Sequence, residues 1–466
     1  MNLPTPAPQL RRRLTWLTAF CVVVAAAGIG YYGFWRYHLK RYQEVDEGVF
    51  YRVAQPTEFG LRHLVERRGI KTVVSLQLYD FRLYSGWLDP GDPSGAQEAD
   101  YVRSLGLRFV QWPMGEEQCW PWPTPWQLEE FIRLVDDPTN HPIMIHCMGG
   151  RHRTGTLSAL YRIEYDRWSA VRALEEMYSF DFGLPVPIHE WNIRTYVPRP
   201  VPTAAEWESL QKGLSSVAPA PFTAAPATTD PSSATATGRY ADLVRVLRAK
   251  RDKSGHEPAD KPAVDPPVDA ALGAYVRSGG PFALSLAMRL IDSPDDPLVK
   301  DAVKGAELRL ATDGGDWNEL QSATAIVADF GGKAEQERLL GLLVSERDEA
   351  ERYEAIVLGV LNRYTPNRIP FLRPLLDDTR PRPAPGLEGL RYCDTAFVRM
   401  AAITDDLPVS SWPLESMRDH GRDTAVKWLA ANPKATELSQ LLPPIGNKAV
   451  MAGIAPLQED LSRMRK

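Results

Sequence analysis

Cysteine is scarce in this sequence. The 466 residues include four cysteines, at positions Cys21, Cys119, Cys147 and Cys393. They are widely separated and form neither a CxxC pair nor a cysteine–histidine spacing typical of a metal site, so we expect no disulfide framework and no bound metal. A strong excess of one charge is also absent, since the formal net charge is −5. The composition therefore gives no reason to expect a nucleic-acid partner.

One long uncharged run is present, near the N-terminus. Residues 14–35 carry no charged side chain in 22 positions, enough for a helix to cross a hydrocarbon core of about 30 Å. Aromatic residues close to both ends favour a retained membrane anchor, and a cleaved signal peptide with small residues at 25–27 is the alternative. Basic residues lie on both sides at 11–13 and 36–41. We therefore expect a single-pass membrane protein and leave its orientation undetermined.

Ten residues, His146 to Gly155, read HCMGGRHRTG. A cysteine and an arginine lie six positions apart in this stretch, with glycines between them. The apolar run 142–145 before it predicts a buried strand, and the pattern from Leu157 to Tyr165 predicts a helix. The loop is thus expected between a strand end and a helix N-terminus, where backbone N–H groups and the helix dipole favour a bound anion.

The residue types in this stretch suit covalent phosphoryl transfer. The electropositive setting favours the thiolate of Cys147, which can attack phosphorus. The planar fork of Arg153 can hold two phosphate oxygens. Gly149 and Gly150 let the backbone curl so that N–H groups point inward, and the Thr154 hydroxyl is placed to hydrogen-bond the sulfur. The expected phosphate-binding residues are Met148, Gly149, Gly150, Arg151, His152 and Arg153, and the expected support of the loop backbone is His146.

The pattern His-Cys-x5-Arg-Thr-Gly resembles the signature of the cysteine-dependent protein tyrosine and dual-specificity phosphatases at every defining position. The resemblance implies an α/β phosphatase domain over residues 42–200 and a phosphorylated protein as substrate. The stretch 51–56 resembles the opening segment of such domains. Arg151 and His152 together resemble both the phosphatases that act on inositol pyrophosphates and many bacterial tyrosine-phosphatase-like proteins. A polyanionic phosphoester such as an inositol polyphosphate therefore stays as an alternative substrate.

Cleavage of a phosphate ester also needs a general acid that protonates the leaving oxygen. In the resembled family this acid is an aspartate on a loop before the signature, and the matching position here holds Glu116, with Glu117 beside it. We expect Glu116 to be the acid, and two solvated loop carboxylates are the alternative. The missing aspartate leaves open a non-catalytic or weakly active phosphate-binding module. No cofactor is expected, because the loop supplies the charge stabilisation that Mg²⁺ provides in other phosphoryl transfers.

Strands alternate with helices throughout residues 42–200. Such alternation predicts a mostly parallel central sheet flanked by helices, placed after the N-terminal transmembrane helix. The expected helices are 58–68, 96–105, 126–135, 156–167 and 169–178, and the expected strands are 72–76, 108–112 and 142–145.

The second half of the chain has a different character. Residues 213–268 form a Pro/Ala/Thr-rich stretch that predicts a flexible linker with a short helix at 240–250. From 269 to 434 helices follow one another, and the region resembles degenerate HEAT-type solenoids, which bind protein partners. A plain helical bundle without a partner is the alternative. Residues 1–13 and 435–466 are expected to be tails. The clearest helical patterns of the C-terminal region are 282–291, 319–328, 335–344, 351–361 and 394–403.

Overall fold

The structure is a computed structural model of the chain. It describes residues 8–77, 97–114, 125–180, 187–215, 268–291, 293–314, 316–383, 390–404 and 414–438, together with a few isolated positions between them. The chain divides into two compact units. Unit 1 comprises Met1–Glu116 and Pro138–Gly155, and unit 2 comprises Glu117–Asp137 and Thr156–Lys466.

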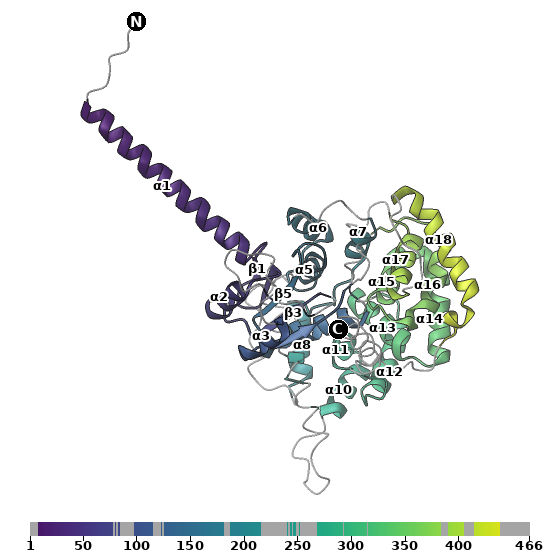
Figure 1. Cartoon of the computed structure of the whole chain (residues 1–466). Coiled ribbons are helices and arrows are strands. Elements are labelled where there is room, and N and C mark those ends of the chain that lie inside the picture. The colour runs from purple at the N-terminus through teal and green to yellow at the C-terminus, as the bar shows by residue number, and fades with distance from the viewer. Residues whose placement is uncertain are drawn as a thin grey trace, which may run out of the picture. The chain divides into compact units, whose positions relative to one another are not determined.

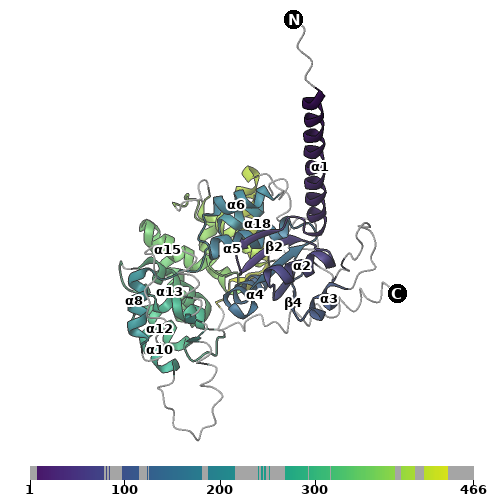
Figure 2. The same ribbon diagram turned by 90° about the vertical axis from the view of Figure 1, so that its left-hand side faces the viewer.

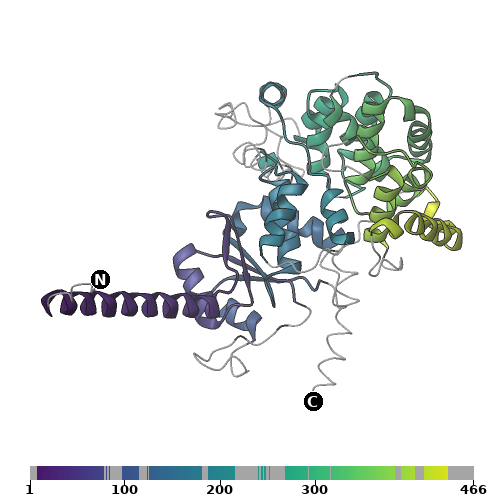
Figure 3. The ribbon, with the colours of Figure 1, turned by 90° about the horizontal axis from the view of Figure 1, so that it is seen from above.

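The first helix, α1, runs over Pro8–His38 and is drawn as one continuous helix in Figures 1 and 3. Its segment Trp16–His38 is long and apolar enough to cross a membrane, and its most apolar stretch is not buried. This segment contains most of the uncharged run predicted at 14–35 and continues beyond it. A signal sequence passes the same test of length and composition, so both interpretations of the run stay open.

Among its described residues, unit 1 contains a five-stranded sheet with the order β1-β2-β5-β3-β4; its strands β2 and β4 are labelled in Figure 2. The edge strand β1 is antiparallel to β2, whereas β2, β5, β3 and β4 are mutually parallel. The central strand β5 is buried at every position. The mostly parallel sheet expected from the sequence is therefore confirmed. The strands are β1 Gln43–Asp46, β2 Phe50–Ala54, β3 Thr72–Ser75, β4 Arg108–Gln111 and β5 Ile143–Cys147.

Two helices of unit 1, α2 (Glu58–Arg68) and α3 (Glu98–Ser104), pack on one face of the sheet. The Thr57 side chain caps α2 by accepting a hydrogen bond from the backbone, and Gly69 ends the helix in the left-handed conformation, as expected for these residue types. Alternate strand residues meet the two helices, because side chains alternate between the faces of a strand. This core contains Tyr51, Val53, Leu61, Leu64, Val73, Val102 and Met144.

Unit 2 is helical in the part of the chain that the structure describes, apart from short 3₁₀ turns and one isolated bridge. The all-helical C-terminal region is thereby confirmed, and its HEAT-type arrangement stays a prediction. Its successive helices are coloured green to yellow in Figure 3. The helices are α4 Pro125–Asp136, α5 His152–Glu164 (in unit 2 from Thr156), α6 Ala170–Ser179, α7 Pro187–Arg194, α8 Ala204–Gly213, α10 Val268–Arg277, α11 Ala283–Leu290, α12 Val299–Leu310, α13 Trp317–Phe330, α14 Lys333–Ser345, α15 Ala350–Leu361, α16 Ile369–Leu376, α17 Tyr392–Ile403 and α18 Leu414–Ala431.

Two details differ from the sequence-based expectations. The helix expected at 156–167 begins earlier, at His152, because its first turn is made of polar signature residues that show no apolar periodicity. Within the expected linker, Tyr240, Leu243 and Leu247 are helical, in agreement with the short helix expected at 240–250, but they are buried, which a flexible linker does not predict. The expected domain boundaries, 42–200 and 269–434, stay predictions.

Candidate functional site

The signature stretch leaves the carboxyl end of the central strand and enters a helix. Cys147 is the last residue of β5 and is 5% exposed. Three residues and Arg151 form the turn, and α5 begins at His152. The carboxyl ends of parallel strands are where open α/β sheets bind their ligands. The expected strand–loop–helix arrangement around Cys147 is therefore present.

Four consecutive carbonyl groups of this turn, those of residues 148–151, accept hydrogen bonds from other residues of unit 1. In a trans peptide the N–H of the next residue points opposite to the carbonyl. The amides of residues 149–152 therefore point away from these donors, an orientation that suits a turn whose N–H groups bind an anion. The four bonds are Gln55 N to Met148 O (3.3 Å), Arg41 Nη1 to Gly149 O (3.0 Å), Arg52 Nη2 to Gly150 O (2.9 Å) and Gly155 N to Arg151 O (2.8 Å).

The tight turn requires glycine at one of its two glycine positions. Gly150 has φ +62°, and a Cβ placed on it would lie 2.7 Å from the backbone nitrogen of Ala54. At Gly149 the nearest atom to such a Cβ is 3.8 Å away, on the flexible side chain of Arg151. The sequence suggested that both glycines let the loop curl, whereas the geometry requires glycine at position 150.

The remaining signature side chains take different positions. Arg153 lies in the first turn of α5, and its Nη1 donates to the carbonyl of Leu76 just beyond β3, at 2.9 Å. Thr154 is fully buried, whereas Met148 is 46% exposed and His152 is also exposed. Arg153 is thus held next to the loop through the end of a neighbouring strand.

Two arginines that the sequence analysis missed support the loop from behind. Arg52 on β2 is fully buried and bonds the Gly150 carbonyl, while Arg41 bonds the Gly149 carbonyl. Arg41 has φ +56°, a left-handed conformation that is costly for a residue other than glycine. Both guanidinium groups add positive charge near the loop. They are distant from the signature in the sequence, and no spacing pattern links them to it.

His146, the expected support of the loop, is fully buried beneath it. Its Nε2 lies 2.9 Å from Oε1 of Glu98, which is also buried. The same carboxylate oxygen accepts a hydrogen bond from Gln55 at 3.2 Å, and the Gln55 side chain accepts one from Gln77. A chain of polar side chains from α3 and the strand ends therefore contacts His146. These contacts fit its expected role in ordering the backbone around Cys147.

The C-terminal end of α1 packs on the same unit. The rings of Phe34 and Phe59 lie 5.5 Å apart, and the His38 ring shares a 2.6 Å hydrogen bond with the Thr57 hydroxyl. The carbonyl of Lys40 then accepts a hydrogen bond from the Ala54 amide at 2.8 Å. The apolar helix thus continues into the rest of unit 1 through a short, bonded segment that includes Arg41, the residue that contacts Gly149.

The expected general acid, Glu116, and its neighbour Glu117 lie outside the described residues. Asp80 is a carboxyl group of unit 1 that the structure does describe. Its Oδ1 accepts a hydrogen bond from the Ala99 amide at 3.0 Å, and burial raises its pKa above the usual value. Among the described residues, no three His, Cys, Asp or Glu side chains gather in a group that could hold a metal ion.

Comparison with known proteins supports the resemblance carried by the signature. Residues 34–184 match the family described as "DSP-PTPase phosphatase fused to NAD+ Kinase". The chain is 45% identical over 135 residues to the dual specificity protein phosphatase TpbA of Pseudomonas aeruginosa, covering 29% of this chain and 52% of TpbA. The expected resemblance to dual-specificity and tyrosine phosphatases is confirmed for this part of the chain.

Other similar proteins are named as phosphatases of inositol phosphates. The chain is 28% identical over 120 residues to inositol diphosphatase DSP1 of Oryza sativa subsp. japonica, covering 25% of this chain and 54% of DSP1. A crystal structure of the core catalytic domain of PP-IP phosphatase SIW14 from S. cerevisiae is 23% identical, covers 34% of this chain and 86% of its own, and has a TM-score of 0.27. This chain thus spans about half the length of DSP1 and TpbA.

Proposed function

We propose that this protein is a membrane-anchored cysteine-dependent phosphatase that hydrolyses phosphate monoesters through a phosphocysteine intermediate. The observation that carries the proposal is the turn after Cys147, whose carbonyls are bonded on the outside and whose amides face the other way. The family match over residues 34–184 supports the same activity. An intact nucleophile and phosphate cradle favour an enzyme over a binding module.

The reaction proceeds in two steps. The thiolate of Cys147 attacks phosphorus, a sulfur–phosphorus bond forms and the ester P–O bond breaks, while Glu116 gives its proton to the leaving oxygen. Water then attacks phosphorus and gives a proton to the Glu116 carboxylate, the sulfur–phosphorus bond breaks to restore the Cys147 thiolate, and inorganic phosphate leaves. Arg153 and the amides of residues 149–152 hold the phosphoryl oxygens in both steps, and Thr154 hydrogen-bonds the departing sulfur. The reaction involves no cofactor.

A phosphorylated protein, with phosphotyrosine or dual specificity, is the leading substrate class. A polyanionic inositol phosphate is the second candidate, favoured by the positive charge of Arg41 and Arg151 at the loop and by the name of the rice relative. The two classes separate in kcat/KM measured with a phosphotyrosine peptide and with an inositol pyrophosphate. A higher value for the pyrophosphate would reverse the order of the candidates.

Substitution of the nucleophile tests the proposal. In the Cys147→Ser protein, turnover of an aryl phosphate should fall by at least about 10³-fold, because the attacking thiolate is gone. Binding of the substrate should persist, since the cradle is unchanged. Equal turnover by both proteins would overturn the enzymatic function. It would leave the non-catalytic phosphate-binding module, which the glutamate at the usual aspartate position favours.

The assignment of Glu116 as the acid has its own test. Glu116→Gln should lower turnover of alkyl phosphates by about 10²-fold, since general-acid catalysis contributes about 10² to 10⁴. Nitrophenyl phosphate, whose leaving group needs little protonation, should be affected far less. Asp80→Asn removes a carboxyl of unit 1 with a raised pKa and is the matched control. If Asp80→Asn shows the leaving-group dependence and Glu116→Gln does not, the acid is misassigned.

Membrane attachment rests on the unburied apolar stretch within Trp16–His38. The protein should stay in the membrane pellet after alkaline carbonate extraction with its N-terminal peptide intact. Recovery of a shortened soluble chain would favour the signal-sequence alternative. The helical region 269–434 is proposed to bind a protein partner.

A further inference from the structure

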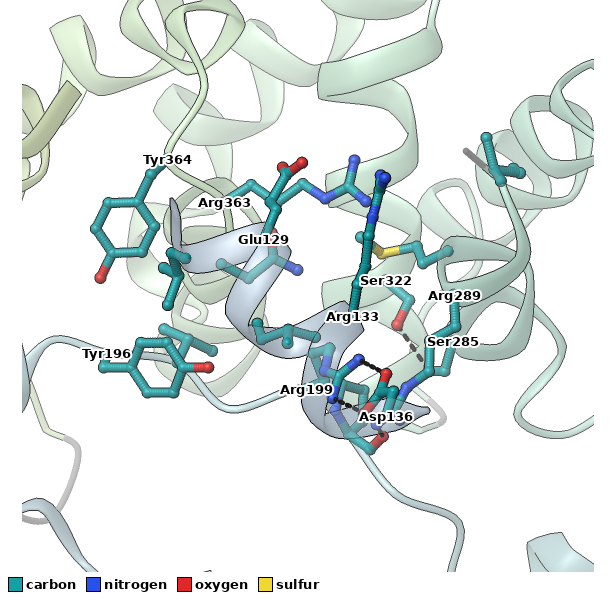
Figure 4. A pocket seen from close by; sticks show the side chains of 17 residues that line it. Glu129, Arg133, Asp136, Tyr196, Arg199, Ser285, Arg289, Ser322, Arg363 and Tyr364 are labelled. Atoms are coloured by element: carbon teal, nitrogen blue, oxygen red, sulfur yellow. Dashed lines mark hydrogen bonds and ion pairs between the residues drawn. The ribbon is translucent and has the colours of Figure 1, made fainter. Parts of the chain in front are cut away.

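A cavity of about 110 Å³ lies inside unit 2 (Figure 4). This volume is several times the ~10–15 Å³ that a single water needs. Its walls come from α4, the segment after α7, α11, α13 and the residues that follow α15. Four arginines line it and two carboxylates, Glu129 and Asp136, accompany them. The arginines are Arg133, Arg199, Arg289 and Arg363.

The carboxylate of Asp136 is already engaged. Arg199 donates to both of its oxygens, at 2.7 and 3.0 Å, and also bonds the buried Glu164. Burial alone would raise the pKa of Asp136, but the charge and hydrogen bonds of Arg199 lower it to about 2. Asp136 is therefore ionised and paired. Its negative charge is matched by Arg199, while Glu129 and the other three arginines also contribute to the potential of the cavity.

Arg289 is the most deeply buried of these cations, at 6% exposure. Its Nη2 donates to the carbonyl of Pro200 at 3.0 Å, and its guanidinium lies 4.4 Å from the centre of the Tyr240 ring. Burial, together with the charge of Arg199, lowers the pKa of Arg289 to about 10. A positive charge is therefore held in this wall at a desolvation cost, which an anion in the cavity would offset.

Other groups of the wall favour the same kind of ligand. Arg363 bonds Asp329 at 3.0 Å, but the same carboxylate oxygen also pairs with the buried Arg368 at 2.8 Å. One negative charge is thus shared by two guanidinium groups. On the adjacent helices, the buried hydroxyls of Ser285 and Ser322 lie 2.7 Å apart. Guanidinium forks are the hydrogen-bond donors that suit a tetrahedral oxyanion, and the two hydroxyls, which bond each other while that of Ser285 also bonds Glu319, add polar surface beside them.

We propose that this cavity binds a small oxyanion of the phosphate class, either free phosphate or the phosphate group of a larger molecule. The site is separate from the signature loop and independent of the proposed activity. The cavity is lined by α4, from within residues 42–200, and by α11 and α13 of the C-terminal region. An anion that binds only when these helices are folded together stabilises unit 2 by mass action.

The test is calorimetric titration of the full-length protein with inorganic phosphate. The protein carries Arg153→Ala, which weakens phosphate binding at the signature loop. One phosphate site should remain in this background. Adding Arg133→Gln, at the half-exposed rim, should weaken its Kd by about 10-fold, the effect of losing one hydrogen bond to a charged group. Ser322→Ala, a small change in a buried wall, should weaken it by a lesser factor.

Arg133 forms an ion pair with Glu130 on its own helix, at 3.7 Å. Arg373→Gln is the matched control, since Arg373 likewise forms an ion pair along its own helix but does not line the cavity. This variant should leave the Kd unchanged. Loss of all phosphate binding in the Arg153→Ala protein would overturn the proposal. So would phosphate binding that Arg133→Gln and Ser322→Ala both leave intact in folded protein. Titration with phenylphosphonate separates the sources: tighter binding than phosphate indicates the group of a larger molecule, and weaker binding indicates free phosphate.

Discussion

At the signature loop the proposed oxyanion contacts are backbone amides together with Arg153, whereas in the cavity of unit 2 they are side chains alone. The arginines behind the loop, Arg41 and Arg52, donate to carbonyls and so fix the peptide planes that aim the amides. The arginines of the cavity line it directly and share it with carboxylates. A backbone cradle is encoded by consecutive residues. A side-chain cradle is assembled from distant segments and leaves no motif in the sequence.

The largest expected effect tests whether the signature loop binds the anion through its backbone geometry. Gly150→Ala should lower kcat/KM for an aryl phosphate by about 10³-fold, because a Cβ 2.7 Å from the Ala54 nitrogen displaces several amides at once. Gly149→Ala, with 3.8 Å of space, should change kcat/KM by less than about threefold on the same argument. Steady-state kinetics of both variants provide the measurement. Comparable losses in the two would mean that the loop does not act through its backbone geometry.

The next effect concerns buried charge beside the cavity. Glu319 on α13 accepts hydrogen bonds from the amides of Leu284 and Ser285 at 3.0 and 3.2 Å, and burial raises its pKa from 4.5 to about 7. The folded state therefore binds this proton more tightly than the unfolded state does. The resulting stability is present below pH 4.5 and is lost as the pH rises to about 7. The loss amounts to about 3 kcal/mol.

Denaturant unfolding at a series of pH values checks this prediction. Glu319→Gln should flatten the fall of the unfolding free energy between pH 4.5 and 7. Glu337→Gln replaces an exposed carboxylate of the neighbouring helix α14 and should keep the wild-type slope. An unchanged slope in Glu319→Gln would show that Glu319 titrates normally in the folded protein. Burial beside the cavity would then disfavour an ionised carboxylate less than the raised pKa of Glu319 implies.

The smallest effect concerns the support behind the loop. Arg41→Ala removes one hydrogen bond to the Gly149 carbonyl and should lower kcat/KM by about 10-fold. Because the substituted residue lies at a carbonyl and not at the reacting atoms, KM should rise more than kcat falls. Arg62→Ala, which removes an exposed arginine bonded to the Tyr101 hydroxyl, is the control. Equal effects of the two variants would indicate a general charge effect rather than positioning of the loop.

Much of the fold could be predicted where local signals agree. The helix at 58–68 was predicted with the bounds that the structure has, because Thr57 and Gly69 mark its ends. The helix Ile369–Leu376 gave no clear pattern, since prolines at 370 and 374 argue against a helix. The edge strand Gln43–Asp46 is four residues long and too short to show alternation.

The residues of the candidate site also fall into two groups, those that a sequence motif identifies and those that only the fold brings together. Cys147 and Arg153 were found from the motif, because spacing along the chain defines them. Glu98, Arg52 and Arg41 contact the loop or His146 only after the sheet has formed. Arg52 lies in the stretch 51–56 that resembles the opening segment of such phosphatase domains, but that resemblance assigns it no role, and no motif surrounds Glu98 or Arg41. Pairing of distant strands, which a single sequence does not reveal, decides which of many buried polar residues reach the site.

The bonded junction between α1 and the sheet of unit 1 has a consequence for how the proposed substrates are met. The segment from His38 to Arg41 is fixed at both ends. His38 shares a hydrogen bond with the Thr57 side chain, and Arg41 donates one to the Gly149 carbonyl in the loop. If Trp16–His38 spans a bilayer, the loop stands at a fixed height above the lipid surface, unlike an enzyme on a flexible tether. Encounter with phosphoesters carried by the same bilayer then becomes a search in two dimensions. Such confinement raises the effective concentration of neighbours in the membrane over that of solutes in bulk.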